Sequence, residues 1–185
     1  MRRIPQRRMP RGYWGVLVLA AALMTVGCGD DDDNPTAPST PNTITFSSTL
    51  LPSNEVPAIA NAEQSGRGTA TITFNLTRNT AGAIQSGTID FHYDLTGFPA
   101  GTTINASHIH PGASGANGSV LVSTGQSPAT ALGLPNGAGS WETRAVSTAD
   151  AATLQSIVDN PAGFYFNVHT ALNPGGVARG QLRAQ

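Results

Sequence analysis

Three histidines carry the clearest chemical signal in this sequence. His108 and His110 are separated by one residue, and His169 lies in a later segment. In an extended strand, residues two apart point to the same side and lie roughly 6.5 to 7 Å apart. Two imidazoles so placed can converge on one ion, and a third from another strand would leave an open position, as zinc and copper sites often have. The pattern is therefore compatible with a metal site for Zn or Cu.

The same histidines also fit a structural role. A buried polar group needs a partner, and an unpartnered one costs roughly 1 to 3 kcal/mol. The histidines could therefore form a buried polar cluster with Glu55, Asn167 and Arg179 that clamps distant strands together. The domain would then be a surface structural or binding module whose loops recognise a protein or a glycan. We expect this structural and binding module, with the metal site as the alternative.

No residue is assigned a catalytic role, and whether the protein is an enzyme stays open. Ser107 precedes His108 directly, but neighbours in a strand point to opposite sides, so they cannot meet as nucleophile and base. Glu55 has no second acid beside it for general acid–base hydrolysis. Redox activity at a copper-loaded site is a further alternative. His92 supplies no second metal site, because it is expected on the wet face of its strand.

The elements that must position these residues are mostly strands. Apolar and polar residues alternate with period two in residues 69–76 and 88–95, which gives each segment one dry and one wet face. Such two-sided strands are typical of antiparallel sheets. Further strands are expected at 43–50, 103–110, 119–123, 139–146, 164–170 and 177–183. Short strands separated by Gly, Pro and Asn predict an all-β fold, an antiparallel Greek-key-like sandwich or a partly open barrel.

The last two expected strands should pair as a hairpin, because only a few residues separate them. In the first of them, Tyr165, Asn167 and His169 alternate with apolar residues and should face away from the core. Pairing would then bring His169 and Arg179 close together or onto adjacent positions.

One short helix interrupts the strands. Residues 147–150 match a capping box, with Asp150 in the first helical turn. Leu154 and Ile157 share one helical face, and Pro161 ends the pattern. We expect this helix to pack across an open end of the sheet.

The start of the chain has the plan of a secretory signal. Residues 1–27 combine five arginines, no acid and a short apolar run over 14–26. That run is shorter than the roughly 20 residues of a stable membrane span. Cys28, the only cysteine, cannot form an internal disulfide, and Thr-Val-Gly-Cys resembles a bacterial lipobox. We therefore expect an exported lipoprotein, held at a bacterial membrane outside the cytoplasm by lipidated Cys28. An ordinary cleaved signal is the alternative.

The remaining chain divides into a tether and a domain. Residues 28–42, with four consecutive aspartates followed by Pro and Thr, predict a disordered tether, and residues 43–185 predict one folded β domain. Removal of the signal leaves five arginines, no lysine and eleven acids, a net charge of −6. A nucleic-acid-binding protein needs a basic patch, so that class is excluded.

Four motifs, taken in order, resemble the CHRD domain, a family named for chordin and widespread in bacterial exported proteins. They are LPSNEVP at 51–57, HIHPG at 108–112 followed by NG at 117–118, YFNVHT at 165–170 and GVARGQL at 176–182. The resemblance covers nearly all of the expected domain and implies an extracytoplasmic β fold without a settled activity. The family often has Gly-Glu where this chain has Gly176-Val177, so a carboxylate beside Arg179 is not implied here.

Overall fold

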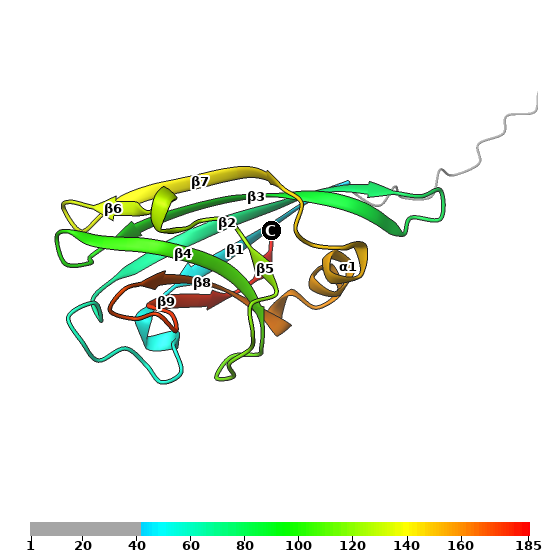
Figure 1. Ribbon diagram of the computed structural model, residues 1–185. Helices are drawn as coiled ribbons and strands as arrows, with labels where there is room; N and C mark the ends of the chain where they lie inside the picture. Colours follow the sequence, from blue (N-terminus) through cyan, green and yellow to red (C-terminus); the bar gives the residue numbers. More distant parts are fainter. Residues whose placement is uncertain (1–41) are drawn as a thin grey trace, which may run out of the picture. The chain divides into compact units, whose positions relative to one another are not determined.

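The computed structural model describes residues 42–185, which form two antiparallel β-sheets packed face to face (Figure 1). The first sheet has the order β10-β1-β2-β3-β7, and the second has the order β5-β4-β8-β9, with β6 also paired to β4. The all-β sandwich expected from the alternating pattern is therefore confirmed. The expected signal peptide (1–27), Cys28 and all but the last residue of the tether (28–42) lie outside the described residues.

The strands follow the period-two segments of the sequence. Those of the first sheet are β1 (Thr43–Leu50), β2 (Arg67–Arg78), β3 (Ile84–Thr96), β7 (Gly139–Val146) and β10 (Arg183–Ala184). Those of the second are β4 (Thr102–Pro111), β5 (Val122–Ser123), β6 (Leu132–Leu134), β8 (Phe164–Thr170) and β9 (Ala178–Gln181). Their dry faces meet in a shared core, where Phe91 of β3 stacks on Phe166 of β8 with ring centroids 5.9 Å apart.

Three segments differ from expectation. The strand expected at 119–123 is reduced to β5, and β6 was not expected. The strand expected at 177–183 divides at Leu182, which is fully buried between β9 and β10. At this residue the chain passes from the second sheet to the first, so one run of residues serves both sheets.

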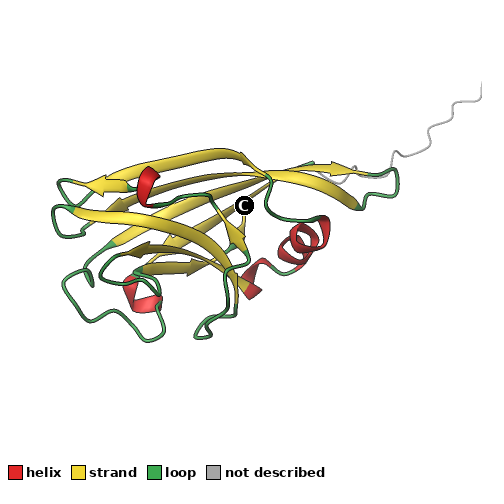
Figure 2. Cartoon of the chain, viewed as in Figure 1, coloured by secondary structure: helices red, strands yellow, loops and turns green. Residues whose placement is uncertain are grey.

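The short helix is present as α1 (Ala151–Asp159), and three 3₁₀ turns lie at Pro52–Asn54, Pro128–Thr130 and Pro161–Gly163 (Figure 2). The predicted cap is wrong in position: Asp150 is itself the N-cap, and its carboxylate accepts the backbone N–H of Thr153 at 2.8 Å. An aspartate in that place satisfies an N–H that the helix leaves unpaired. Leu154 and Ile157 are fully buried in the core. Within residues 42–185, no helix is long and apolar enough to cross a membrane.

The two sheets meet along one side. Leu51, just after β1, exchanges both backbone hydrogen bonds with Arg179 of β9, at 3.1 and 3.3 Å. The close approach needs Gly180, because a Cβ there would lie 2.1 Å from the carbonyl oxygen of Thr49. In Figure 1 the segments that follow β1 and β4 lie below β8 and β9, so that they cover the second sheet.

Candidate metal site

The covered face of the second sheet is unusually polar for a buried surface. In β8, Phe166 and Val168 point into the core, and Tyr165, Asn167 and His169 take the alternate positions. These three side chains are nevertheless only 1 to 7% exposed. Loops rather than a second sheet exclude water from this face.

The strand register gathers further polar residues on the same face. His108 and His110 of β4 pair with Asn167 and Tyr165 of β8, and Asn167 pairs in turn with Arg179 of β9. Cross-strand pairs place their Cβ atoms roughly 4.5 to 5.5 Å apart. The pleat and the register together therefore position this set, and Arg179 faces Asn167, one same-face position away from His169.

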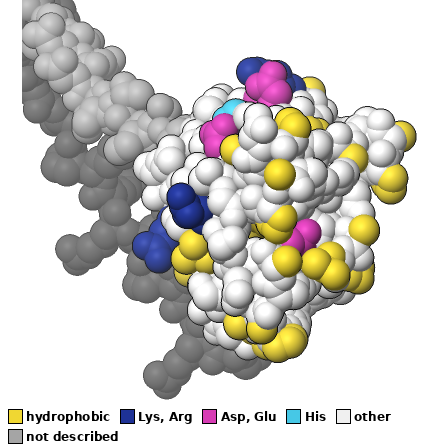
Figure 3. Space-filling model, turned by 90° about the vertical axis from the view of Figure 1, so that its left-hand side faces the viewer, with side chains coloured by type: hydrophobic (Ala, Val, Ile, Leu, Met, Phe, Trp, Pro, Cys, Tyr) yellow, Lys and Arg dark blue, Asp and Glu magenta, His cyan; other side chains and the backbone are white. Residues whose placement is uncertain are grey.

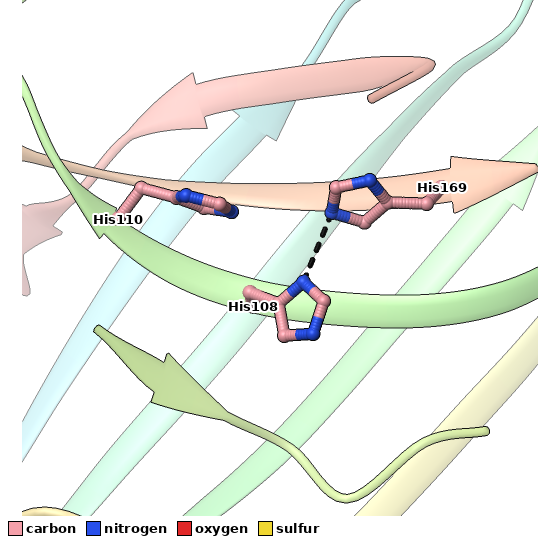
Figure 4. A group of neighbouring side chains, drawn as sticks. All are labelled: His108, His110 and His169. Carbon is pink, nitrogen blue, oxygen red and sulfur yellow. Dashed lines mark hydrogen bonds between the residues drawn. The ribbon is translucent and has the colours of Figure 1, made fainter. Parts of the chain in front are cut away.

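The three histidines come together in one place. One ring nitrogen of His108, one of His110 and one of His169 all lie within 4.8 Å of one another (Figure 4). Nδ1 of His108 is 3.0 Å from Nε2 of His169. We call these residues the histidine triad. Tetrahedral ligation at 2.0 to 2.1 Å would place the nitrogens about 3.4 Å apart, so closing the set around an ion requires only a small ring movement.

Backbone carbonyls fix which nitrogens of the triad can bind a metal. Nδ1 of His110 donates to the carbonyl of Gly118 at 3.0 Å, and Nδ1 of His169 donates to that of Pro174 at 3.1 Å. A carbonyl can only accept, so in each neutral ring Nε2 keeps its lone pair. Nε2 of His110 is buried and has no hydrogen-bond partner within residues 42–185. Metal-binding histidines usually make this kind of second bond, which orients the ring.

The electrostatic surroundings keep the imidazoles neutral. Burial, followed by the charges of His169 and His110, lowers the pKa of His108 from 6.5 to about 4. Burial also lowers the pKa of His110 and of His169, against the opposing effect of their carbonyl partners. Since only unprotonated imidazole binds a metal, the triad is in its ligating state at neutral pH.

A second buried group lies beside the triad and is centred on Arg179, which is 2% exposed. Its Nε donates to the carbonyl of Asn54 at 2.7 Å, and its Nη1 donates to Oδ1 of Asn117 at 2.8 Å. Its guanidinium carbon lies 4.5 Å from the ring centroid of Tyr165. Glu55 approaches with Oε2 3.8 Å from Nε, which is too far for a hydrogen bond. Burial raises the pKa of Glu55 to about 7, although the Arg179 charge opposes that rise.

Tyr165 links the two groups, a role that the sequence did not indicate. Its ring stacks on His110 at 4.9 Å with an interplanar angle of 3°, and it also contacts Arg179. Its hydroxyl accepts the backbone N–H of Gly118 at 3.2 Å. Alternation had placed this residue of the YFNVHT motif on the same face as Asn167 and His169, as the structure confirms. The expected single cluster is thus two groups, the histidine triad and the Glu55–Arg179 pair.

Two other polar residues lie where the sequence indicated. Ser107 is fully buried on the core side of β4, where it hydrogen-bonds Thr124 and Gln126. It therefore points away from His108, as the alternation predicted. His92 lies on the outer face of the first sheet, where its half-exposed ring contacts Asp94 at 3.0 Å.

Comparison with known protein families gives one match. The model of the CHRD domain family matches residues 46–182, a range that includes the whole histidine triad and the Glu55–Arg179 pair. No curated protein and no solved structure matches the chain.

Proposed function

The chain belongs to the CHRD domain family, and from this premise we propose that its β domain is a metal-binding module that holds Zn or Cu in the histidine triad. The observation that carries the proposal is the pair of carbonyl contacts from Gly118 and Pro174, which leave the Nε2 lone pairs of two histidines available in a group whose ring nitrogens lie within 4.8 Å of one another. A site of this kind has three neutral nitrogen ligands and an open position. Zinc and copper both accept imidazole in such numbers.

A metal titration tests this proposal. The processed protein, carrying Cys28→Ser and no histidine tag, is treated with a chelator and then titrated with Zn²⁺ or Cu²⁺ during thermal unfolding. A metal that binds only the folded state stabilises it by about 2.7 kcal/mol at one hundred times its Kd. We expect this stabilisation in the parent, none in His110→Ala, and the full effect in His92→Ala, which lies outside the triad. An unchanged midpoint in the parent would overturn the proposal.

A second candidate function is a structural and binding module without a metal, whose loops present a site for a protein or a glycan. It is favoured by the same carbonyl bonds, because they tie the segments around Gly118 and Pro174 to the sheet without any ion. In that case His110→Ala would lower the free energy of unfolding by roughly 1 to 3 kcal/mol. Neither Zn²⁺ nor Cu²⁺ would move the midpoint of the parent.

We further propose that the protein works outside the cytoplasm, anchored at a bacterial membrane by lipidated Cys28. The support is the basic and apolar start of the chain and the single cysteine that follows it. A multiply acylated cysteine binds a bilayer with about 0.8 kcal/mol for each buried CH₂. Fractionation of cells that express Cys28→Ser tests the anchor. The variant should move to the soluble fraction, and retention at the membrane would exclude lipidation at this residue.

A further inference from the structure

A cleft of about 300 Å³ lies beside the histidine triad and is separate from it. Three loop segments form its walls: residues 55–59 after β1, Asn117 after β4, and residues 172–176 between β8 and β9. The volume is at the lower end of the range for small-molecule sites, which run from about 300 to 1,000 Å³. The cleft is therefore large enough for a small molecule.

Glu55, which lines the cleft, carries an acceptor without a hydrogen-bond partner. The side chain lines the cleft, is 7% exposed, and has a buried Oε1 without a hydrogen-bond partner anywhere in residues 42–185. The nearest cation does not satisfy it: Arg179 directs Nε and Nη1 to Asn54 and Asn117, and its Nη2, like Oε1 of Glu55, is buried without a hydrogen-bond partner in residues 42–185. A buried carboxyl group without hydrogen bonds is costly, so a ligand that donates to this oxygen would gain by satisfying it.

Aliphatic side chains form part of the remaining wall, together with the amide side chains of Asn117 and Asn173. Val56, Pro57, Ile59 and Leu172 line the cleft, and Val56 and Leu172 are 39% and 57% exposed. Figure 3, which views the end of the domain at the left of Figure 1, shows several groups of apolar side chains with few charged ones among them. Exposed aliphatic side chains around a polar floor fit a ligand with a polar head and a short hydrocarbon body.

We propose that this cleft binds small aliphatic primary amines, with the ammonium group donating to Glu55 and the hydrocarbon chain lying against Val56 and Leu172. An ammonium offers three donors and a charge opposite to that of the carboxylate, which makes the hydrogen bond roughly twice as strong as a neutral one. A carboxylic acid would instead bring a second anion to Glu55. An alcohol offers one donor and no charge, so it should bind more weakly.

The test uses n-butylamine, n-butanol and sodium butyrate as probes of equal chain length. Each is titrated into the Cys28→Ser protein in the presence of a chelator, and the backbone amides of residues 55–59 and 172–176 are followed by NMR. The chelator removes any metal, so binding of the amine at an ion in the triad cannot contribute. We expect saturable shifts with butylamine at a Kd in the roughly millimolar range, weaker shifts with butanol and none with butyrate.

Three variants make the result decisive. Glu55→Gln should weaken butylamine binding at least about tenfold, which corresponds to 1.4 kcal/mol. Leu172→Lys places an ammonium at the exposed rim of the cleft, where it repels the ligand's ammonium. This variant should weaken butylamine binding by a similar factor without burying a charge. Glu142→Gln, which removes an exposed carboxylate from the first sheet, should leave it unchanged. Equal binding by all the variants, or no binding by the parent, would overturn the amine site. The metal titration described above is independent of either outcome.

Discussion

Nδ1 of His108 lies 3.0 Å from Nε2 of His169, although these residues are not a cross-strand pair: His108 pairs with Asn167, and His169 pairs with Ala106. The contact is therefore diagonal across β4 and β8. Since the proton of His169 is on Nδ1, where it is donated to Pro174, the proton between the two rings must come from His108. A metal ion that enters the triad would replace that proton, and His108 would change tautomer.

The metal-free protein should lose stability in acid. The pKa of His108 is lowered from 6.5 to about 4, so between these pH values the unfolded chain binds a proton that the folded chain does not. Stability therefore rises with pH across this window and falls on acidification, and the lowered pKa values of His110 and His169 act in the same direction. Urea unfolding with a chelator at pH 4.5 and pH 7 measures the difference. Equal free energies of unfolding at both pH values would contradict this prediction.

Glu55 should oppose this trend. Its pKa is raised from 4.5 to about 7, so its contribution is fully present below pH 4.5 and is lost as the pH rises through 7. Glu55→Gln removes that opposing contribution, and the variant should show a steeper loss of stability between pH 7 and pH 4.5 than the parent. The same urea series checks this. Glu142→Gln, at an exposed position, should reproduce the parental slope.

Arg179→Met should be strongly destabilising. The substitution leaves the carbonyl of Asn54 and Oδ1 of Asn117 without a donor and removes the charge nearest to Glu55. Breaking a buried pair by removal of one member costs about 3 to 5 kcal/mol. Arg144→Met is the matched control, because Arg144 pairs with Glu142 at an exposed position, where such pairs contribute at most about 1 kcal/mol. Comparable losses in both variants, measured by urea unfolding, would show that Arg179 is not an anchor.

Substitution of Gly176 should destabilise the domain more than substitution of its neighbour Gly175. Gly176 has φ of +132°, and a Cβ there would lie 2.3 Å from Nδ2 of Asn167, whereas nothing lies within 4 Å of a Cβ at Gly175. Gly176→Ala should therefore cost roughly 1 to 3 kcal/mol through backbone strain, with a further cost from moving Asn167. Gly175→Ala should change stability by at most about 0.5 kcal/mol. The two midpoints in one thermal series check this, and equal midpoints would contradict the close packing over Asn167.

Metal and amine binding should influence each other. Two loops connect the triad to the cleft. The carbonyl of Gly118 accepts from His110, and the preceding residue, Asn117, lines the cleft. The carbonyl of Pro174, which also lines the cleft, accepts from His169. An ion that orders both histidines should also order these walls of the cleft. We therefore expect Zn²⁺ to raise the affinity for butylamine by about 5-fold or more. Thermodynamic linkage then requires butylamine to raise the affinity for Zn²⁺ by the same factor. NMR shifts of the cleft amides at residues 55–59 with and without Zn²⁺ measure the effect on butylamine at the cleft itself, and calorimetric titration of Zn²⁺ with and without butylamine measures the reverse effect. Identical affinities would show that the cleft and the triad are independent.

The alternation of apolar and polar residues predicted the fold and the polar face of the second sheet. It did not predict the shortest strand or the contacts made by loop backbone. The bounds of β1, β7 and β8 agree with the expected ranges to the residue, whereas β2 and β3 extend beyond the alternating segments at 69–76 and 88–95. The strand β6 has only three residues in a Gly-rich stretch, too few for a pattern to register. The gathering of the histidines depends on the register between β4 and β8. The carbonyl partners of His110 and His169 belong to loop residues Gly118 and Pro174. Every residue has a backbone carbonyl, so the residue type does not show which one will accept a hydrogen bond.

The bridge between Leu51 and Arg179 has a consequence for assembly. A bare strand at the border of a sheet can recruit another chain by backbone pairing, which leads to strand addition or aggregation. The outer side of β9 is already occupied by Leu51, and the chain then turns into β10 on the opposite layer. A peptide could add as a strand to β9 only if the backbone hydrogen bonds between Leu51 and Arg179 were broken first. Recognition at this edge of the second sheet must therefore come from side chains and loops.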